Sequence, residues 1–147
     1  MYVLFEGIDG VGKSTQIEIL ASKFSDAIVT KEPGGTKLGE NLREILLSSN
    51  IKIGKRAEIL LFLADRAEHF EKLVAPNLSK LILSDRGFIS GIAYALANDE
   101  SLDENVLLEL NKFALNDKFA DKIIFFEASH ALISSRLKAR GTSDKIE

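Results

Sequence analysis

The sequence predicts an α/β fold, in which a parallel β-sheet carries helices on both of its faces. Two observations support this prediction. Short apolar runs alternate along the chain with longer segments whose apolar residues recur every three or four positions. The first apolar run also leads through a glycine-rich turn directly into a helical segment. Such alternation is typical of parallel sheets, because each new strand needs a crossover connection, usually a helix.

Each element is predicted from its own apolar pattern. Short, mostly apolar runs bounded by turn residues indicate buried strands, and they cover residues 2–6, 27–30, 81–83 and 123–126. Helical spacing predicts the helices, as in the first of them, where Ile17, Leu20 and Phe24 share one face. The predicted helices cover residues 16–24, 38–47, 57–73, 88–97, 104–114 and 131–139. Pro76 is expected to end the longest of them.

The composition is that of a globular protein. Of 147 residues, 46% are apolar and 28% are charged, which is enough for one domain with a core. The net charge of −3 argues against a general nucleic-acid binder. The absence of cysteine excludes disulfides and thiolate metal sites, and no apolar run reaches the length of a membrane span. We therefore expect a cytoplasmic protein with no nucleic-acid or membrane partner.

Residues 7–14, GIDGVGKS, match G-x-x-x-x-G-K-[ST] between a predicted strand and a predicted helix. In such a loop the glycines let backbone N–H groups converge on a phosphate, and the helix N-terminus adds partial positive charge. Lys13 can reach the β- and γ-phosphates, and the Ser14 hydroxyl can ligate Mg²⁺. The alternative is a glycine-rich turn with a solvated lysine. The predicted nucleotide-binding residues are Gly7, Ile8, Asp9, Gly10, Val11, Gly12, Lys13, Ser14 and Thr15.

A second pair of residues narrows the class of nucleotide enzyme. The third predicted strand leads into Asp85 and Arg86, next to the phosphate loop. Asp85 can hold Mg²⁺ through water, and Arg86 can bind a second phosphate group, although a surface ion pair is the alternative. The Asn-Lys-x-Asp segment with which a GTPase reads its base is missing from the sequence. These features predict the P-loop NTPase fold in its nucleoside monophosphate kinase form.

Four separated segments resemble the thymidylate kinase family. They are residues 5–15 (FEGIDGVGKST), 30–36 (TKEPGGT), 61–69 (LFLADRAEH) and 85–94 (DRGFISGIAY), in the order that the family has. The second segment has Lys31 where the family has arginine. In the fourth, Gly87 replaces the tyrosine of the family pattern D-R-Y-x-x-S-x-x-A-Y, so any contact of that side chain is lost. The resemblance runs from Tyr2 to Glu147.

The resemblance implies a reaction: the γ-phosphoryl group of ATP, with Mg²⁺, passes to dTMP and gives dTDP and ADP for dTTP biosynthesis. It implies that the Phe62 ring stacks on thymine and that Arg66, on the same helix face, donates to the O4 oxygen. Arg43 and Arg86 would hold the dTMP phosphate, and Asp9 would bind the sugar 3′-hydroxyl. The other implied substrate-binding residues are Glu32 and Pro33, for which a cis peptide bond is one possibility, and Ser90 and Tyr94, over base and sugar.

Taken alone, several of these side chains have simpler interpretations. Phe62 can be ordinary core packing, Tyr94 can be helix packing, and Arg43 can be a solvated charge. For Asp65 and His69 in the third segment we keep the simpler interpretation, which is a helix-face hydrogen bond or contact with solvent.

A basic segment near the end, with Arg136, Lys138 and Arg140, resembles the lid that the family closes over ATP. Because the phosphate loop has Gly10 and no arginine, the resemblance implies a catalytic arginine in the lid, Arg140 first and Arg136 second. A solvated helix end is the alternative. The predicted catalytic residues are Lys13, Asp9, Arg86, Arg140 and Arg136.

We expect a single kinase domain over residues 1–147, truncated at or just after the lid at 136–147, so that the C-terminal part of the family is missing. The resemblance also implies a homodimer packed through helices. Two other functions stay open: a small kinase for a different nucleotide or for a nucleoside, and an inactive module that only binds phosphates.

Overall fold

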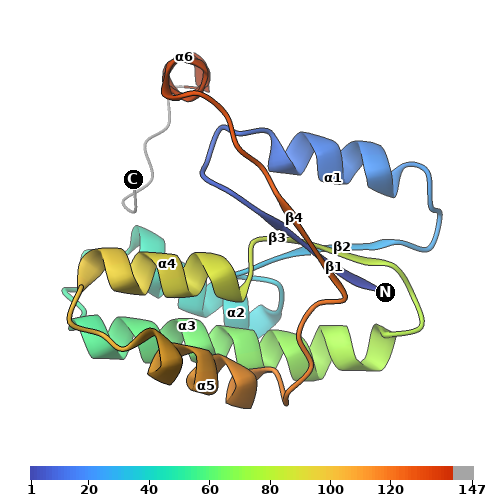
Figure 1. Cartoon of the computed structure of the whole chain (residues 1–147). Helices are drawn as coiled ribbons and strands as arrows, with labels where there is room; N and C mark the ends of the chain where they lie inside the picture. Colours follow the sequence, from blue (N-terminus) through green and yellow to red (C-terminus); the bar gives the residue numbers. More distant parts are fainter. Residues whose placement is uncertain (141–147) are drawn as a thin grey trace.

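The computed structural model describes residues 1–140, and within them it has one parallel sheet with helices on both faces (Figure 1). The strands lie in the order β2-β3-β1-β4 and run parallel to one another. Their bounds are Tyr2–Glu6 for β1, Ile28–Lys31 for β2, Ile82–Asp85 for β3 and Lys122–Phe125 for β4. The predicted α/β class and parallel sheet are therefore confirmed.

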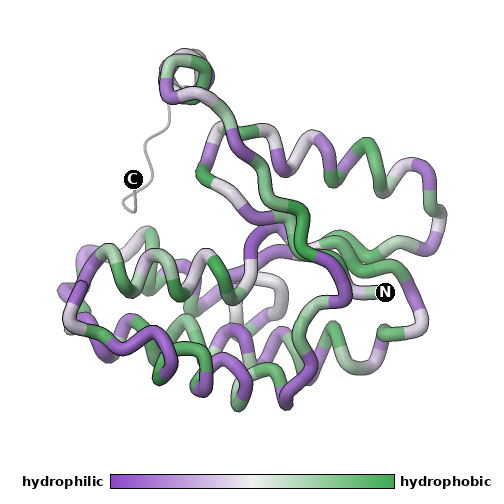
Figure 2. The backbone as a smooth tube through the Cα atoms, in the orientation of Figure 1, coloured by the Kyte–Doolittle hydropathy of each residue, from purple (hydrophilic) through white to green (hydrophobic). Residues whose placement is uncertain are grey.

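The central strand β1 is buried along its whole length, and its residues alternate between two cores. Tyr2 and Leu4 face the core under the long helix α3, where they meet Val74. Val3 and Phe5 face the opposite core, where they meet Ile17 of α1. This alternation is the period of two expected for a strand with a helical layer on each side. Figure 2 shows the strands as a largely hydrophobic centre between these layers.

The helices are α1 (Lys13–Ala21), α2 (Lys37–Arg43), α3 (Lys55–His69), α4 (Phe88–Asn98), α5 (Glu104–Ala114) and α6 (His130–Arg140). Helix α1 lies on one face of the sheet, and α2 to α5 lie on the other (Figure 1). The predicted helix 104–114 has the bounds of α5, and the other predicted helices coincide with observed ones apart from their ends. No helix in the part of the chain that the structure describes is long and apolar enough to cross a membrane.

Several predicted ends were wrong. Helix α1 begins at Lys13, three residues before the predicted start, because the phosphate loop passes directly into it. Within the predicted helices 38–47 and 57–73, only the first parts are α-helical, as α2 and α3. The chain then continues in π turns, Glu44–Ser48 after α2 and Phe70–Val74 after α3. Pro76 lies inside a following 3₁₀ turn, Ala75–Asn77, where its missing N–H group is tolerated. Strand β3 extends to Asp85, and β2 and β4 are each displaced by one residue.

The carboxyl ends of three strands meet at one edge of the sheet. Phe5 of β1 is in register with Asp85 of β3, and Lys31 of β2 is in register with the same residue. The loops that follow these strands are the three segments from which the sequence predicted phosphate and substrate binding. In open α/β sheets this edge is where ligands bind.

Candidate active site

The phosphate loop between β1 and α1 adopts a backbone that needs its glycines. Gly7 has a φ of 136° and Gly12 a φ of 108°, both in the region that L side chains avoid. At Gly7 a Cβ atom would also lie 2.5 Å from the carbonyl oxygen of Phe126. Gly12 immediately precedes α1, so the loop delivers the chain to the helix N-terminus, where N–H groups are free of intrahelical partners.

Lys13 is buried and folds back over the loop. Its Nζ donates to the carbonyl oxygens of Gly7, at 2.9 Å, and Ile8, at 3.2 Å. The same atom lies 3.5 Å from Oδ1 of Asp9 and 3.7 Å from Oδ1 of Asp85. Burial, and then the charge of Arg86, lower the pKa of Lys13, while the two carboxylates oppose this shift. The ammonium group is therefore held at the place where a phosphate chain would cross the loop.

Ser14 and Asp85 form an oxygen-rich pair beside the loop. The Ser14 hydroxyl donates to Asp85 Oδ2 at 2.8 Å. The other oxygen, Asp85 Oδ1, is buried and accepts no hydrogen bond from the residues that the structure describes. A hydroxyl and a carboxylate with spare lone pairs fit Mg²⁺, which takes one or two protein oxygens and keeps waters. The residues present therefore fit the predicted metal.

One of the two lid arginines lies against the phosphate loop. Arg136, on α6, donates through Nη1 to the carbonyl oxygens of Gly10, at 3.1 Å, and Val11, at 3.0 Å. Arg140 is the last residue of α6, and its side chain lies outside the described part of the structure, as do residues 141–147 of the predicted lid.

A pocket of about 620 Å³, including space open to solvent, lies next to the loop on the side of α3 and α4. The predicted substrate-binding residues all line it, together with Asp9 from the phosphate loop and with Leu47, Gly87 and Gly91. They are Glu32, Pro33, Arg43, Phe62, Arg66, Arg86, Ser90 and Tyr94. Predicted substrate-binding residues as far apart in the chain as Glu32 and Tyr94, 62 positions, thus line one pocket.

Arg86 joins this pocket to the phosphate loop. Its Nη2 pairs with Asp9, and its Nη1 donates to the Ser90 hydroxyl at 3.1 Å. The guanidinium also lies 5.5 Å from the centre of the Tyr94 ring. Burial lowers the pKa of Arg86, but Asp9, Tyr94 and Asp85 together outweigh it, so the net shift is upward. Ser90 in turn donates to Glu6 at the end of β1, which fixes α4 against the sheet.

Arg66 is buried and held by two partners. Its Nε donates to Glu32 Oε2 at 2.8 Å, and its Nη1 donates to Asn111 Oδ1 at 2.7 Å. The second oxygen of Glu32, Oε1, lies 2.8 Å from Nδ1 of His69, whose Nε2 lies 2.8 Å from the Thr30 hydroxyl. Burial alone raises the pKa of Glu32, but Arg66 and His69 outweigh burial and lower it. Both carboxylate oxygens of Glu32 are thus committed to protein partners.

The loop between β2 and α2 is held by hydrogen bonds to side chains of α2 and α3. Arg43 donates through Nη1 to the carbonyl oxygen of Pro33 at 3.0 Å, and the Glu32–Pro33 bond is cis. From α3, Asp65 accepts a hydrogen bond from the N–H of Gly34 at 2.9 Å. Burial raises the pKa of Asp65 to about 6, although that hydrogen bond opposes the shift. Asp65 and His69 therefore make hydrogen bonds to this loop, which is one of the two interpretations kept for them.

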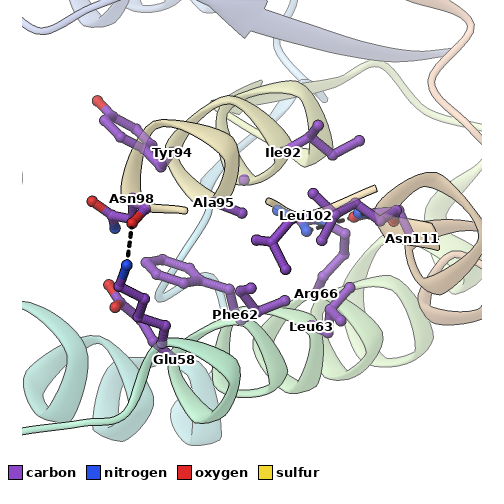
Figure 3. A pocket seen from close by; sticks show the side chains of 14 residues that line it. Glu58, Phe62, Leu63, Arg66, Ile92, Tyr94, Ala95, Asn98, Leu102 and Asn111 are labelled. Atoms are coloured by element: carbon purple, nitrogen blue, oxygen red, sulfur yellow. Dashed lines mark hydrogen bonds between the residues drawn. The ribbon is translucent and has the colours of Figure 1, made fainter. Parts of the chain in front are cut away.

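A second cavity, of about 490 Å³, lies behind the first, between α3, α4 and α5. Figure 3 shows Phe62 and Arg66 rising from α3 toward α4, while Asn111 enters from α5. The half-buried Phe62 ring lines both cavities, as do Arg66, Gly91 and Tyr94. Phe62 is thus a wall between two cavities rather than a side chain enclosed in the core.

Sequence reasoning did not identify Glu6 or Asn111. Glu6 precedes the phosphate loop and reads as the end of a strand. Asn111 is a buried polar residue on the apolar face of α5. A polar residue at a position where the helical pattern expects an apolar one was the only sign in the sequence of a special role.

Comparison with known proteins agrees with this geometry. The model of the thymidylate kinase family matches residues 5–147. The chain belongs to the thymidylate kinase family. It is 95% identical over 147 residues to a thymidylate kinase of Campylobacter concisus, covering 100% of the chain and 75% of that protein. It is 68% identical to the enzyme of Campylobacter curvus over the same residues, 76% of that protein.

A solved structure agrees as well. The crystal structure of thymidylate kinase from Ehrlichia chaffeensis matches with a TM-score of 0.77 at 32% identity, over 95% of this chain and 78% of that one. The predicted family, the P-loop kinase fold and the reaction class are therefore confirmed: thymidylate kinases are ATP-dependent nucleoside monophosphate kinases, and ATP is the phosphoryl donor of the family.

Proposed function

We propose that the site transfers the γ-phosphoryl group of ATP to dTMP, giving dTDP and ADP for dTTP biosynthesis, where the phosphate loop meets the side-chain pocket. Membership of the thymidylate kinase family supports the reaction. The observation that carries the assignment of residues is the ion pair between Asp9 and Arg86, because it connects the phosphate loop to the wall of the pocket. Two nucleotides bound on either side would meet end to end at this point.

On the donor side, the N–H groups of residues 7–15 would cradle the phosphates of ATP. Lys13 needs only to turn from the Gly7 and Ile8 carbonyls to reach the β- and γ-phosphates. Ser14 and Asp85 would hold Mg²⁺, which supplies positive charge to offset the charge on the phosphates.

On the acceptor side, the Phe62 ring would stack on thymine and Arg66 would donate to the O4 oxygen. Arg43 and Arg86 would bind the 5′-phosphate, which is the nucleophile. Asp9 would accept a hydrogen bond from the sugar 3′-hydroxyl, since a carboxylate so near the phosphates is tolerated when it binds a hydroxyl. Ser90 and Tyr94 would border the base and the sugar.

A lid arginine would neutralise charge that develops on the transferred group. Arg136 is supported by its two bonds to the phosphate loop, since a small rotation of its side chain would direct the guanidinium to the γ-phosphate. Arg140 is the alternative and is four residues further along the same helix.

A coupled assay of ADP release tests the proposed substrate, with dTMP, dUMP, CMP, GMP and thymidine as acceptors. We expect dTMP to be strongly preferred. A clear preference for any other acceptor would refute the proposal. Mg²⁺ dependence is tested in the same assay by adding a chelator, which should stop turnover.

A homodimer and a cytoplasmic location remain part of the proposal. Helix α5 exposes Val106, Leu110 and Phe113 on one face, and Phe113 is 86% exposed, which is typical of a helix that packs on another surface. Sedimentation of the unmodified chain and of Phe113→Asp tests the dimer. We expect the substitution to shift the dimer toward monomer, and an unmodified chain that sediments as a monomer would contradict it.

A further inference from the structure

Asn111 is a buried polar side chain in a place where an apolar one would be expected. It lies on α5 between the buried residues Leu107 and Ala114, and it is only 4% exposed. Burying an amide stabilises the fold only if its donor and acceptor groups find partners. Asn111 Nδ2 donates to the Leu107 carbonyl oxygen, one turn earlier, at 2.8 Å. Because the amide nitrogen makes that bond, the amide oxygen faces α3.

The amide oxygen is the second anchor of Arg66. A single bond from Nε to Glu32 would leave the planar guanidinium free to swing about that contact. A second bond, from Nη1 to Asn111, fixes the plane as well as the position of the group. With Nε and Nη1 engaged, Nη2 forms no hydrogen bond within residues 1–140 and is left for a ligand in the pocket that Arg66 lines.

Helix α4 forms the remaining side of the space that holds the Arg66 guanidinium. A Cβ atom at Gly91 would lie 3.1 Å from both Nη1 and Nη2 of Arg66. The guanidinium therefore lies close against the helix backbone, and a side chain at position 91 would have to displace it by a few tenths of an ångström. The residue is inside α4 without a positive φ, so its role here is to leave space for a side chain rather than to allow a turn.

We infer that Asn111 is a positioning residue for base recognition: together with Glu32 and the gap at Gly91 it aims the Arg66 guanidinium at the carbonyl oxygen of a pyrimidine. This inference rests on the proposed binding of dTMP. Asn111 lines the cavity behind the acceptor pocket and not the pocket itself, so it acts on the base through Arg66. Its effect is on which base is accepted and how tightly the monophosphate binds.

The test compares Asn111→Leu, Asn111→Asp and Gly91→Ala with the unmodified chain. Calorimetric titration gives the dissociation constants of dTMP, dCMP and ATP, and the coupled assay gives KM and kcat. Matched controls are Asn105→Leu, an exposed asparagine on the same helix, and Gly54→Ala, where an added Cβ has nothing within 4 Å.

We expect Asn111→Leu to weaken dTMP binding about tenfold, the usual effect of one hydrogen bond to a charged group, with the ATP constant unchanged. The preference for dTMP over dCMP should narrow, since a loosened guanidinium distinguishes a carbonyl from an amino group less well. Asn111→Asp keeps an acceptor for Arg66 and should recover most of the affinity. Gly91→Ala should weaken dTMP binding without lowering the melting temperature, because alanine is the better helix former.

If Asn111→Leu and Gly91→Ala bind dTMP as the unmodified chain does, the inference is wrong. It is also wrong if Asn111→Leu weakens dTMP and ATP binding equally and Asn111→Asp restores neither, because a general loss of structure would then explain the effect. Failure of the proposed function differs from both results: the unmodified chain itself would then not turn over dTMP. If Asn111→Leu does not fold, Gly91→Ala decides.

Discussion

The donor and acceptor sides of this site are built in different ways. The phosphate loop is one continuous segment, and the groups that we propose for phosphate binding are mostly backbone N–H groups fixed by glycine geometry. The acceptor pocket is made of side chains from the β2–α2 loop, α3 and α4, with α5 behind them. A local backbone device can be recognised from a short sequence pattern, whereas a pocket made of distant side chains depends on the whole fold.

The largest effect should come from Lys13→Ala on the donor side. The substitution removes the buried ammonium group that folds over the phosphate loop, so kcat should fall by a factor on the order of 10³ or more. The coupled assay with saturating dTMP measures this, and Lys23→Ala, at an exposed lysine, is the control. A retained rate would refute the assignment of the loop.

On the acceptor side, Arg66→Ala should do two things that Lys13→Ala does not. It should weaken dTMP binding far more than ATP binding. It should also lower the free energy of unfolding by about 3–5 kcal/mol, because the Glu32 carboxylate is left buried beside an empty space. Chemical denaturation measures the second effect. If Lys13→Ala destabilises the protein more than Arg66→Ala does, it is wrong that the acceptor side depends on buried side-chain contacts more than the donor side does.

Asp85→Asn tests the proposed Mg²⁺ site beside the phosphate loop. The substitution removes the charge of the carboxylate whose Oδ1 lacks a hydrogen bond in the described chain, so more Mg²⁺ should be needed for half-maximal activity, by about tenfold. Titration of activity against Mg²⁺ measures this shift. Asp26→Asn, at an exposed aspartate, should leave the titration unchanged.

A further prediction concerns the pH dependence of stability at Asp65. Its pKa rises from 3.8 to about 6 on folding, so between these values the folded protein holds a proton that the unfolded chain has released. Stability should therefore fall as the pH rises through this window. Asp65→Asn keeps the oxygen that accepts from Gly34 and removes the ionisation, so it should gain about 1–3 kcal/mol over the unmodified chain between pH 4 and pH 7.

Thermal unfolding at a series of pH values checks this prediction. Stability curves of the two proteins that stay parallel from pH 4 to pH 7 would contradict it. The exposed Asp26→Asn serves again as the control, and it should follow the unmodified chain throughout.

The sequence was most informative where structure is local. Strands and helices followed from apolar periodicity, and the phosphate loop followed from its glycines. The ends of α2 and α3 could not be predicted, because a π turn differs from an α-helix only in which carbonyl accepts each bond. Helix α1 began early because Gly12 sets its first residue by backbone geometry, which apolar spacing does not reveal.

In the pocket, the predicted residues lie together, but their partners were not predicted. Glu32 lines the pocket, but the sequence did not predict that its two oxygens would be bound by Arg66 and His69. Asn111 could not be assigned from the sequence, because its partner is 45 positions away and on another helix. Buried polar contacts between helices depend on how those helices pack, and one sequence without its structure does not specify this.

The most direct test of the central claim is a calorimetric titration of dTMP into the unmodified chain, Phe62→Ala and Lys13→Ala. We expect Phe62→Ala to bind dTMP at least about tenfold more weakly, since stacking on one base contributes about 1–3 kcal/mol. Lys13→Ala should bind dTMP almost as the unmodified chain does, because Lys13 serves the donor side. Equal binding of dTMP to Phe62→Ala and the unmodified chain would show that the pocket beside that ring does not hold the base, which would refute the proposed acceptor site.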